Sequence, residues 1–212
     1  MAETSDMVLE EVQRRRGTWL SVVLATLVAL YGITTAGAAF LANAADGQAN
    51  DAYFNGVAFL NDANSIDLAS LILELEDFRI LDEIAIQETL TGDQELIDYI
   101  EAGLSSPAVD AIERSGFLDD GYYNELYGAA DDFFESAEAE FQAAEALNNT
   151  ADSFQLVVLV LAVGLSFVAW ASLGEKVTVT RVLFVIMAVI IYILGTLGLF
   201  GVWLASPIAL FG

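Results

Sequence analysis

The chain has 212 residues, of which 56% are hydrophobic, and yet its formal net charge is −24. It contains no histidine and no cysteine, which excludes the commonest general base, the thiolate nucleophile and disulfide bonds. Lys and Arg together number only seven, which leaves no basic surface for nucleic acid. High apolar content and high negative charge conflict within one soluble domain, so we expect them in separate segments.

The charged residues are segregated along the sequence. Residues 17–45, 153–174 and 182–212 contain none, and each stretch is longer than the roughly 18 residues that mark a membrane span. Most acidic residues lie between the first two stretches. We therefore predict an all-α membrane protein with three transmembrane helices. The predicted spans are 17–45, 153–173 and 182–205. The segments outside the membrane are a short cytoplasmic segment 1–16, an acidic helical extracellular domain 46–152, a cytoplasmic loop 174–181 and an extracellular tail 206–212.

The basic residues predict the orientation in the cell membrane. Cytoplasmic loops are enriched in Lys and Arg, so the segments that carry such residues are expected inside the cell and residues 46–152 outside. These topology-setting residues precede the first span or lie between the second and third spans: Arg14, Arg15, Arg16, Lys176 and Arg181.

Small residues recur along the first span, at Ala25, Ala29, Gly32, Ala36 and Ala39. In lipid such a stripe lets two helices approach closely. It predicts either packing against the chain's own spans or an interface between copies, and the sequence favours neither. Small and apolar residues continue at helical spacing beyond the membrane, so we expect the first span to extend outward as a long stalk helix.

Further helix boundaries follow from capping signals. Asn64-Ser65 offers a cap for a new helix, Thr91 to Gln94 and Ser106-Pro107 each predict the start of a short helix, and Gly103 and Gly116 predict where those short helices end. The helix after Asn64-Ser65 would have one apolar face, formed by Leu68, Leu71, Ile72, Leu75, Phe78, Leu81 and Ile84.

A second stalk helix is predicted from Asp120 to Trp170, antiparallel to the first. Its apolar residues recur at spacings of four and three, as in a helix that packs along a partner helix, although Glu140 interrupts the series. The sequence leaves open whether that partner belongs to the same chain or to another copy. The predicted seam consists of Leu126, Ala130, Phe133, Ala137, Ala144, Leu147, Ala151, Phe154, Val158, Leu161, Leu165 and Val168.

The third span carries Gly195, Gly198 and Gly201, whose bare faces suit close helix contact. The spans contain no acidic or basic residue, which argues against a proton-coupled transporter. A pore lined by uncharged polar side chains stays open as a possibility. Its candidate lining residues are Thr34, Thr35, Asn43 and Thr196.

Candidate chemistry outside the spans is sparse. The adjacent acids Asp119-Asp120 and Asp131-Asp132, and Asp62 with its neighbouring asparagines, could collect a hard cation, but none has the spacing of a calcium loop. We therefore predict no metal and no cofactor. Asn148-Asn149-Thr150 is a glycosylation sequon, with Asn148 as the acceptor. Its aromatic neighbours upstream are interpreted as packing residues of the extracellular bundle, namely Tyr122, Tyr123, Tyr127, Phe133, Phe134 and Phe141.

The layout resembles three-pass membrane proteins of archaea and bacteria that have no assigned activity. The resemblance rests on the order of anchor helix, acidic helical domain, Ala/Glu-rich helix from Phe133 to Leu147, and closing hairpin of spans. The single lysine and the pI near 4.1 resemble the composition of proteins from extreme halophiles. Residues 46–152 also resemble the four-helix ligand-binding domains of chemoreceptors, but the chain lacks a cytoplasmic output module after the second span.

These observations lead to three hypotheses of function. The first is a non-enzymatic, homo-oligomeric integral membrane protein that acts as a cell-envelope scaffold or as an accessory subunit of a membrane assembly. The second is a homo-oligomeric ion channel or pore. The third is a membrane sensor that relays through a partner. The expected partners are the lipid bilayer, further copies of the chain and another membrane protein.

Overall fold

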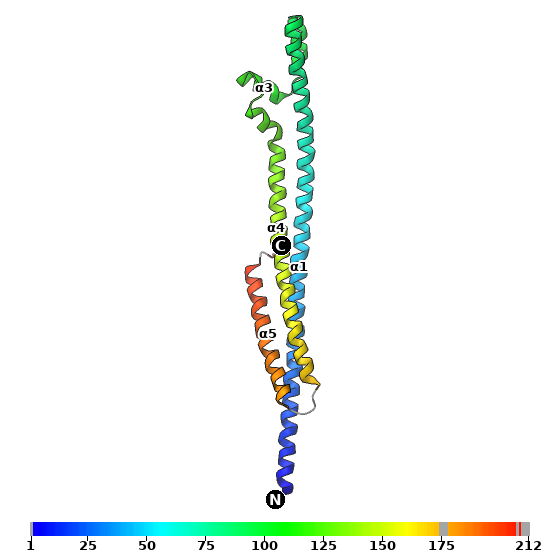
Figure 1. Ribbon diagram of the computed structural model, residues 1–212, viewed down its shortest axis with the longest axis vertical. Coiled ribbons are helices and arrows are strands. Elements are labelled where there is room, and N and C mark those ends of the chain that lie inside the picture. Colours follow the sequence, from blue (N-terminus) through cyan, green and yellow to red (C-terminus); the bar gives the residue numbers. More distant parts are fainter. Residues whose placement is uncertain (1, 174–177, 207, 209–212) are drawn as a thin grey trace. The chain divides into compact units, whose positions relative to one another are not determined.

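The chain is helical throughout the part that the structure describes. The computed structural model describes residues 2–173, 178–206 and 208, with side chains from residue 19 onward. The described residues form α1 (Ala2–Leu90), α2 (Gln94–Glu101), α3 (Ser106–Ser115), α4 (Asp120–Ser172) and α5 (Val179–Ala205), and no strand (Figure 1). Of these helices, α1, α4 and α5 are long and apolar enough to cross a membrane. The predicted all-α class with three membrane-spanning helices is confirmed.

The helices pack into two compact units. Unit 1 comprises residues 1–51 and 144–212, and unit 2 comprises residues 52–143. Both α1 and α4 have residues in each unit. The predicted extracellular domain, 46–152, thus extends a few residues into unit 1 at either end.

Unit 1 is a three-helix packing of α1, α4 and α5 around Tyr31. The Tyr31 ring is fully buried, and its hydroxyl donates a hydrogen bond to the carbonyl oxygen of Ala188 on α5 at 2.6 Å. The ring also lies against Gly164 of α4, where no side chain intervenes, and meets Tyr192 edge-on at 5.1 Å. A buried hydroxyl in an apolar core needs such an acceptor, so Tyr31 specifies how the three helices meet.

The start of α5 is held against the end of α4 by Arg181. This side chain is buried, and its Nε donates to the carbonyl oxygen of Ala171 at 2.7 Å. A cation is favourable there because the last carbonyls of a helix carry partial negative charge. Thr178 caps α5 by accepting from the Arg181 backbone N–H. Arg181 therefore has a structural role besides the topological one predicted, whereas Lys176 lies outside the described residues.

Unit 2 is built on α1 and α4, which run antiparallel within it. Gly56 faces the ring of Phe141, while Ser70, further along α1, donates to the carbonyl oxygen of Leu126 at 2.5 Å. The short helices α2 and α3 connect α1 to α4, and a small core of Ala108, Ala111, Tyr122 and Leu126 joins α3 to α4. The predicted layer of short helices between two long ones is confirmed.

The seam predicted on α4 is filled within one chain. Most of its residues are buried or half-buried: Leu126, Ala130, Phe133, Ala137, Ala144, Leu147, Ala151, Phe154, Val158, Leu161 and Val168. Leu165 is exposed instead, because the seam there runs through Gly164, against which Tyr31 packs. The prediction for Leu165 was wrong. The described seam is covered within the chain, by α1 in unit 2 and by both α1 and α5 in unit 1.

The expected helix start at Asn64-Ser65 was also wrong, because α1 continues without a break to Leu90. A cap residue begins a helix only where the preceding chain is not helical, and no Gly or Pro interrupts the sequence here. The two short helices do begin and end near the predicted signals. Their N-caps are Asp93 and Ser105, and Gly116 ends α3 with φ 79°, a conformation that favours glycine.

Gly164→Ala tests the packing around Tyr31. A Cβ at this position would collide with the Tyr31 hydroxyl and ring, which cannot move without losing the hydrogen bond to Ala188. We expect the melting temperature of the full chain in detergent, followed by circular dichroism, to fall by about 5 °C or more, because overpacking a core costs about 1–3 kcal/mol. Gly37→Ala is the matched control, since no atom lies within 4 Å of its Cβ position. Equal melting temperatures for the two variants would contradict the assignment.

Candidate functional site

Asp77 lies at the junction of three helices in unit 2, with only 1% of its surface exposed. Its Oδ1 accepts a hydrogen bond from the backbone N–H of Ser105 at 2.8 Å. Its Oδ2 accepts from the hydroxyls of Ser105 at 2.6 Å and Tyr122 at 3.0 Å. A buried carboxylate is tolerated when its oxygens are hydrogen-bonded in this way. Asp77 thus joins α1 to the beginning of α3 and to α4.

The first turn of α3 is suited to a carboxylate. Ser105 is the N-cap of α3, and its hydroxyl oxygen accepts from the backbone N–H of Ala108 at 3.3 Å while the hydroxyl donates to Asp77. Pro107 follows in the first turn, where its missing N–H costs nothing. The helix N-terminus carries partial positive charge, which stabilises the anion of Asp77 without a basic side chain.

A second carboxylate, Glu74, lies one turn before Asp77 and accepts a hydrogen bond from the Tyr127 hydroxyl of α4. This hydrogen bond, with burial, raises the pKa of Tyr127 to about 12. Burial, and then the hydrogen bond to Asp77, raise the pKa of Tyr122 well above its ordinary value. Both tyrosines therefore stay neutral at physiological pH and remain donors to the two carboxylates.

The turn from α3 into α4 is fixed by an ion pair at the surface. Arg114 donates from Nε and Nη2 to the two carboxylate oxygens of Asp119, at 2.9 and 2.7 Å. The guanidinium holds the pKa of the Asp119 carboxyl well below its usual range. Asp119 also accepts from the backbone N–H of Tyr122 at 3.1 Å, so the same carboxylate caps the start of α4.

This arrangement is suited to holding helices together rather than to chemistry. Asp77 is covered by protein, so a solute cannot reach it without opening the junction. Among residues described by the structure, no three acidic, histidine or cysteine side chains gather to hold a metal ion. Of the acid pairs singled out in the sequence, Asp119 is engaged by Arg114, and Asp131 and Asp132 face solvent.

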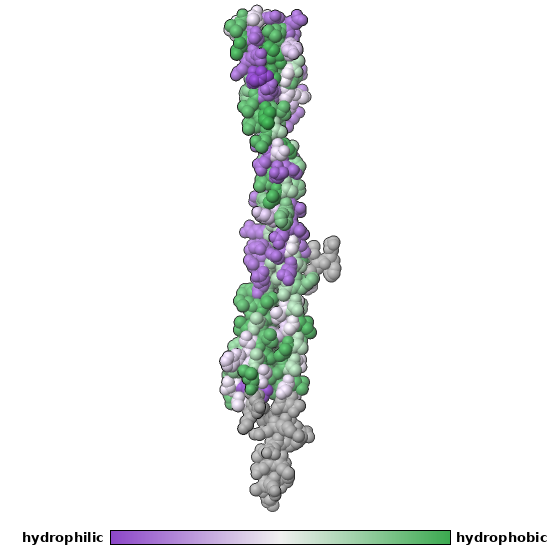
Figure 2. All heavy atoms as spheres, turned by 90° about the vertical axis from the view of Figure 1, so that its right-hand side faces the viewer, coloured by the Kyte–Doolittle hydropathy of each residue, from purple (hydrophilic) through white to green (hydrophobic). Residues whose placement is uncertain are grey.

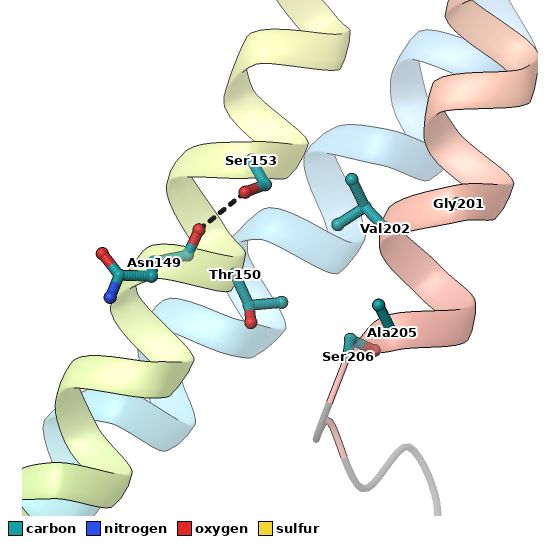
Figure 3. A pocket seen from close by; sticks show the side chains of 7 residues that line it. All are labelled: Asn149, Thr150, Ser153, Gly201, Val202, Ala205 and Ser206. Carbon is teal, nitrogen blue, oxygen red and sulfur yellow. Dashed lines mark hydrogen bonds between the residues drawn. The ribbon is translucent and has the colours of Figure 1, made fainter.

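Several shallow hollows are present in the described part of the molecule, and two of them, one in each unit, have several polar residues in their lining. One, of about 440 Å³, lies in unit 2 beside α2 and is lined by Glu76, Arg79, Tyr99 and Gly103 among others. The other, of about 340 Å³, lies in unit 1 between α4 and α5 (Figure 3). Its lining includes Thr150, Ser153 and Gly201, and the Ser153 hydroxyl donates a hydrogen bond to the carbonyl oxygen of Asn149. Neither hollow has converging polar groups that would orient a small molecule.

The predicted small-residue stripe of the first span lies on the uncovered side of α1. Ala25, Ala29, Gly32 and Ala36 are exposed and Ala39 is half-buried, while a Cβ added at Gly32 would meet nothing within 4 Å. The side of α1 that packs against its own chain is formed by other residues, namely Leu20, Leu24, Leu27, Tyr31, Ala38, Ala42, Ala45 and Ala49. Packing within the chain therefore does not explain the stripe.

The three glycines of α5 differ in whether another helix of the chain lies against them. A Cβ at Gly195 would lie 2.6 Å from Cδ2 of Leu161, and one at Gly198 would lie 3.5 Å from Cγ2 of Val157, so both face α4 within the chain. Gly201 has nothing within 4 Å. The proposed contact surface on the third span is thus internal at two of its three positions.

The remaining predicted residues are scattered. Thr34 lies 3.1 Å from the hydroxyl of Tyr192, and the Thr196 hydroxyl is buried without a partner inside the described structure. Asn43 is exposed on α1, and Asn148 is exposed on α4. The side chains of Arg14, Arg15 and Arg16 lie outside the described residues, and their backbone belongs to α1. Thr34 and Thr196 thus face inward in unit 1, Thr35 is half-buried, and Asn43 is exposed.

Sequence reasoning missed Asp77, Ser105 and Tyr31. A signal for Asp77 was present: Gly56, Ala63, Ser70 and Asp77 recur every seven residues and form the buried side of α1 in unit 2. An acid in register with small residues indicates a buried carboxylate. Four of the six aromatic residues upstream of the sequon contact α1, as predicted: Phe133 lies 6.1 Å from Phe59, Phe141 lies 5.6 Å from Tyr53, and Tyr122 and Tyr127 donate to Asp77 and Glu74. Tyr123 is exposed instead.

The fold and the site define a class: an all-α chain with three helices able to cross a membrane and an acidic helical unit joined through the buried carboxylate of Asp77. Comparison with protein-family models, with curated proteins and with solved structures found no match to this chain.

Asp77→Ala tests the junction in unit 2. The substitution leaves the Ser105 and Tyr122 donors buried without an acceptor, which costs about 2–4 kcal/mol. We expect amide hydrogen exchange in the first turn of α3 to accelerate by roughly 30-fold or more, measured by mass spectrometry on the full chain. Glu88→Ala, an exposed acid on the same helix, is the control. Unchanged protection of α3 in Asp77→Ala would contradict the role assigned to Asp77.

Glu74→Gln tests the carboxylate beside Tyr127. The largest cause of the raised pKa is the hydrogen bond to the Glu74 carboxylate. Glutamine offers only a weaker, neutral acceptor and also removes the negative charge, so the Tyr127 pKa should fall from about 12 towards the ordinary value of 10. A raised pKa means that the contact stabilises unit 2 below pH 10 and that this contribution is lost as the pH rises through 12. The measurement is an NMR titration of ¹³Cζ-labelled tyrosine in the full chain, with Tyr127→Phe to assign the signal. A Tyr127 pKa that stays near 12 in Glu74→Gln would exclude Glu74 as the cause.

Proposed function

We propose that this chain is a non-enzymatic integral membrane protein that self-associates and presents unit 2 outside the cell, as a scaffold or as an accessory subunit of a larger membrane assembly. The observation that carries the proposal is the uncovered stripe of Ala25, Ala29, Gly32 and Ala36 on α1. Small residues in a membrane helix serve close helix contact, and their own chain leaves them unoccupied. A second copy of the same span is the partner that every such membrane contains.

The orientation in this proposal follows the positive-inside rule, with the N-terminus and the α4–α5 connection in the cytoplasm. It is supported by the basic residues at both places and by the concentration of acidic residues in unit 2. Dense surface carboxylates keep such a unit hydrated, as the halophile-like composition suggests. The absence of histidine and cysteine from the sequence and the burial of Asp77 support a non-enzymatic role.

Gly32→Leu tests the self-association. A leucine in the middle of the stripe would keep the two helices apart, so the dissociation constant in liposomes should rise at least tenfold. The measurement is single-molecule photobleaching over a range of protein-to-lipid ratios. Gly37→Leu is the matched control, because Gly37 is equally uncovered but lies off the stripe. A wild-type chain that is monomeric at all ratios would overturn the proposal.

The same liposomes separate the scaffold from the channel alternative. A scaffold oligomer should give no ion flux above that of empty liposomes, whereas reproducible conductance that Gly32→Leu abolishes would favour a channel. No observation in the described residues favours the channel specifically, since Thr34 and Thr196 face inward within unit 1.

A further inference from the structure

An apolar face of α1 in unit 2 is left uncovered by the rest of the chain. The residues Phe54, Val57, Leu68, Leu71, Ile72, Leu75 and Phe78 are between 42% and 69% exposed. They include most of the apolar face that the sequence predicted after Asn64-Ser65. Unit 2 contains most of the acidic residues of the chain and belongs in water, where exposed apolar surface of this extent is unusual. Figure 2, which views the α1 side, shows such apolar patches between hydrophilic ones.

The face has the spacing of a coiled-coil seam. Exposed positions recur at alternating intervals of three and four residues from Phe54 to Phe78 when Asn61 and Asn64 are included, and Ile72 lies beside this series. The opposite side of α1, with Gly56, Ala63, Ser70 and Asp77, is the side that contacts α4. The seam consists of Phe54, Val57, Asn61, Asn64, Leu68, Leu71, Leu75 and Phe78, and ends at Asp82.

We infer that this seam packs against the same seam of a second copy, with the two α1 helices parallel and in register. The inference rests on the proposed self-association and names a contact surface outside the membrane. Two copies inserted in one membrane with the same topology necessarily have parallel α1 helices, and the membrane holds them at high local concentration. In register, Leu68 meets Leu68 and Leu75 meets Leu75, as in a two-stranded coiled coil.

The polar residues of the seam are compatible with an identical partner. Asn61 and Asn64 carry amides that both donate and accept, so each can pair with its own copy. An asparagine at a core position is a known means of fixing register and the number of strands. No carboxylate occupies a seam position from Phe54 to Phe78, so two highly acidic copies meet along this line without facing charges.

The area of the face is sufficient for a stable pair. With about 200 Å² for a fully exposed residue of this size, the observed fractions correspond to roughly 800 Å² on each copy. That is the area that an interface of standard size buries on each partner.

Cysteine substitution tests the pairing, because the natural chain contains no cysteine. Leu68→Cys and Leu75→Cys are each made in the full chain in membranes and treated with a mild oxidant. The matched control is Leu73→Cys, which is also apolar, on α1 and 47% exposed, but lies off the seam. We expect at least fivefold more disulfide-linked dimer at positions 68 and 75 than at 73, since only seam positions bring two Cα atoms within about 7 Å.

The outcomes separate this inference from the proposed function. Three outcomes would overturn the parallel pair alone. They are equal cross-linking at positions 73 and 75, no cross-linking of a chain that photobleaching shows to be oligomeric, and a disulfide-linked adduct between the cysteine at position 75 and a different protein. A monomeric wild-type chain without cross-links would overturn both. Adding Leu68→Asp to Leu75→Cys places two carboxylates opposite each other in the seam and should reduce the dimer by fivefold or more. An unchanged yield would also count against the seam.

Discussion

The antiparallel contact between α1 and α4 is the interaction on which unit 2 depends. Small residues every seventh position on α1, namely Gly56, Ala63 and Ser70, let α4 approach closely enough for Phe141 to lie on Gly56 and for Ser70 to reach a backbone carbonyl. Close approach gains dispersion contacts over the whole length of the contact, although each one is small. A single helix packed in this way covers only one side of α1.

Polar groups then fix the register that apolar packing alone leaves free. In unit 2, Asp77 can satisfy its oxygens only when Ser105 and Tyr122 are in place. In unit 1, Tyr31 has a single acceptor, the carbonyl of Ala188, and its ring fits only over Gly164. A slip by one turn would bury these groups unpaired, at a cost of about 1–3 kcal/mol for each. In both units, therefore, a buried polar side chain with specific hydrogen-bond partners fixes how the helices align.

The sequence predicts the long elements well and the specific contacts poorly. The uncharged stretches and most of the α4 seam follow from local patterns, and the structure confirms them. The short helices begin close to the predicted signals, but their N-caps are Asp93 and Ser105 rather than Thr91 and Ser106. The start expected at Asn64-Ser65 does not exist, because capping residues also occur within helices when their neighbours remain helical. The register of Asp77 with Gly56, Ala63 and Ser70 marks it as a buried position, but Ser105 resembles any other helix cap. The sequence does not show that Ser105 and Tyr122 are the partners of Asp77, because that depends on contacts between distant segments.

The uncovered faces of α1 have different physical meanings in the two units. In a membrane, exposed Val22, Ile33 and Phe40 are in contact with lipid, which is as apolar as they are, so their exposure carries no penalty. In water, each fully buried leucine or phenylalanine is worth about 1.5–3 kcal/mol relative to an exposed one. Leu68, Leu75 and Phe78 lack much of this free energy of burial in the single chain, because they are exposed. In the proposed topology, with unit 2 in water, the driving force for the proposed pairing is larger in unit 2, where the hydrophobic effect acts, than in unit 1, where only close packing favours association. A membrane anchor that aligns the helices and a water-exposed seam that joins them would then act together, the first supplying orientation and the second most of the free energy.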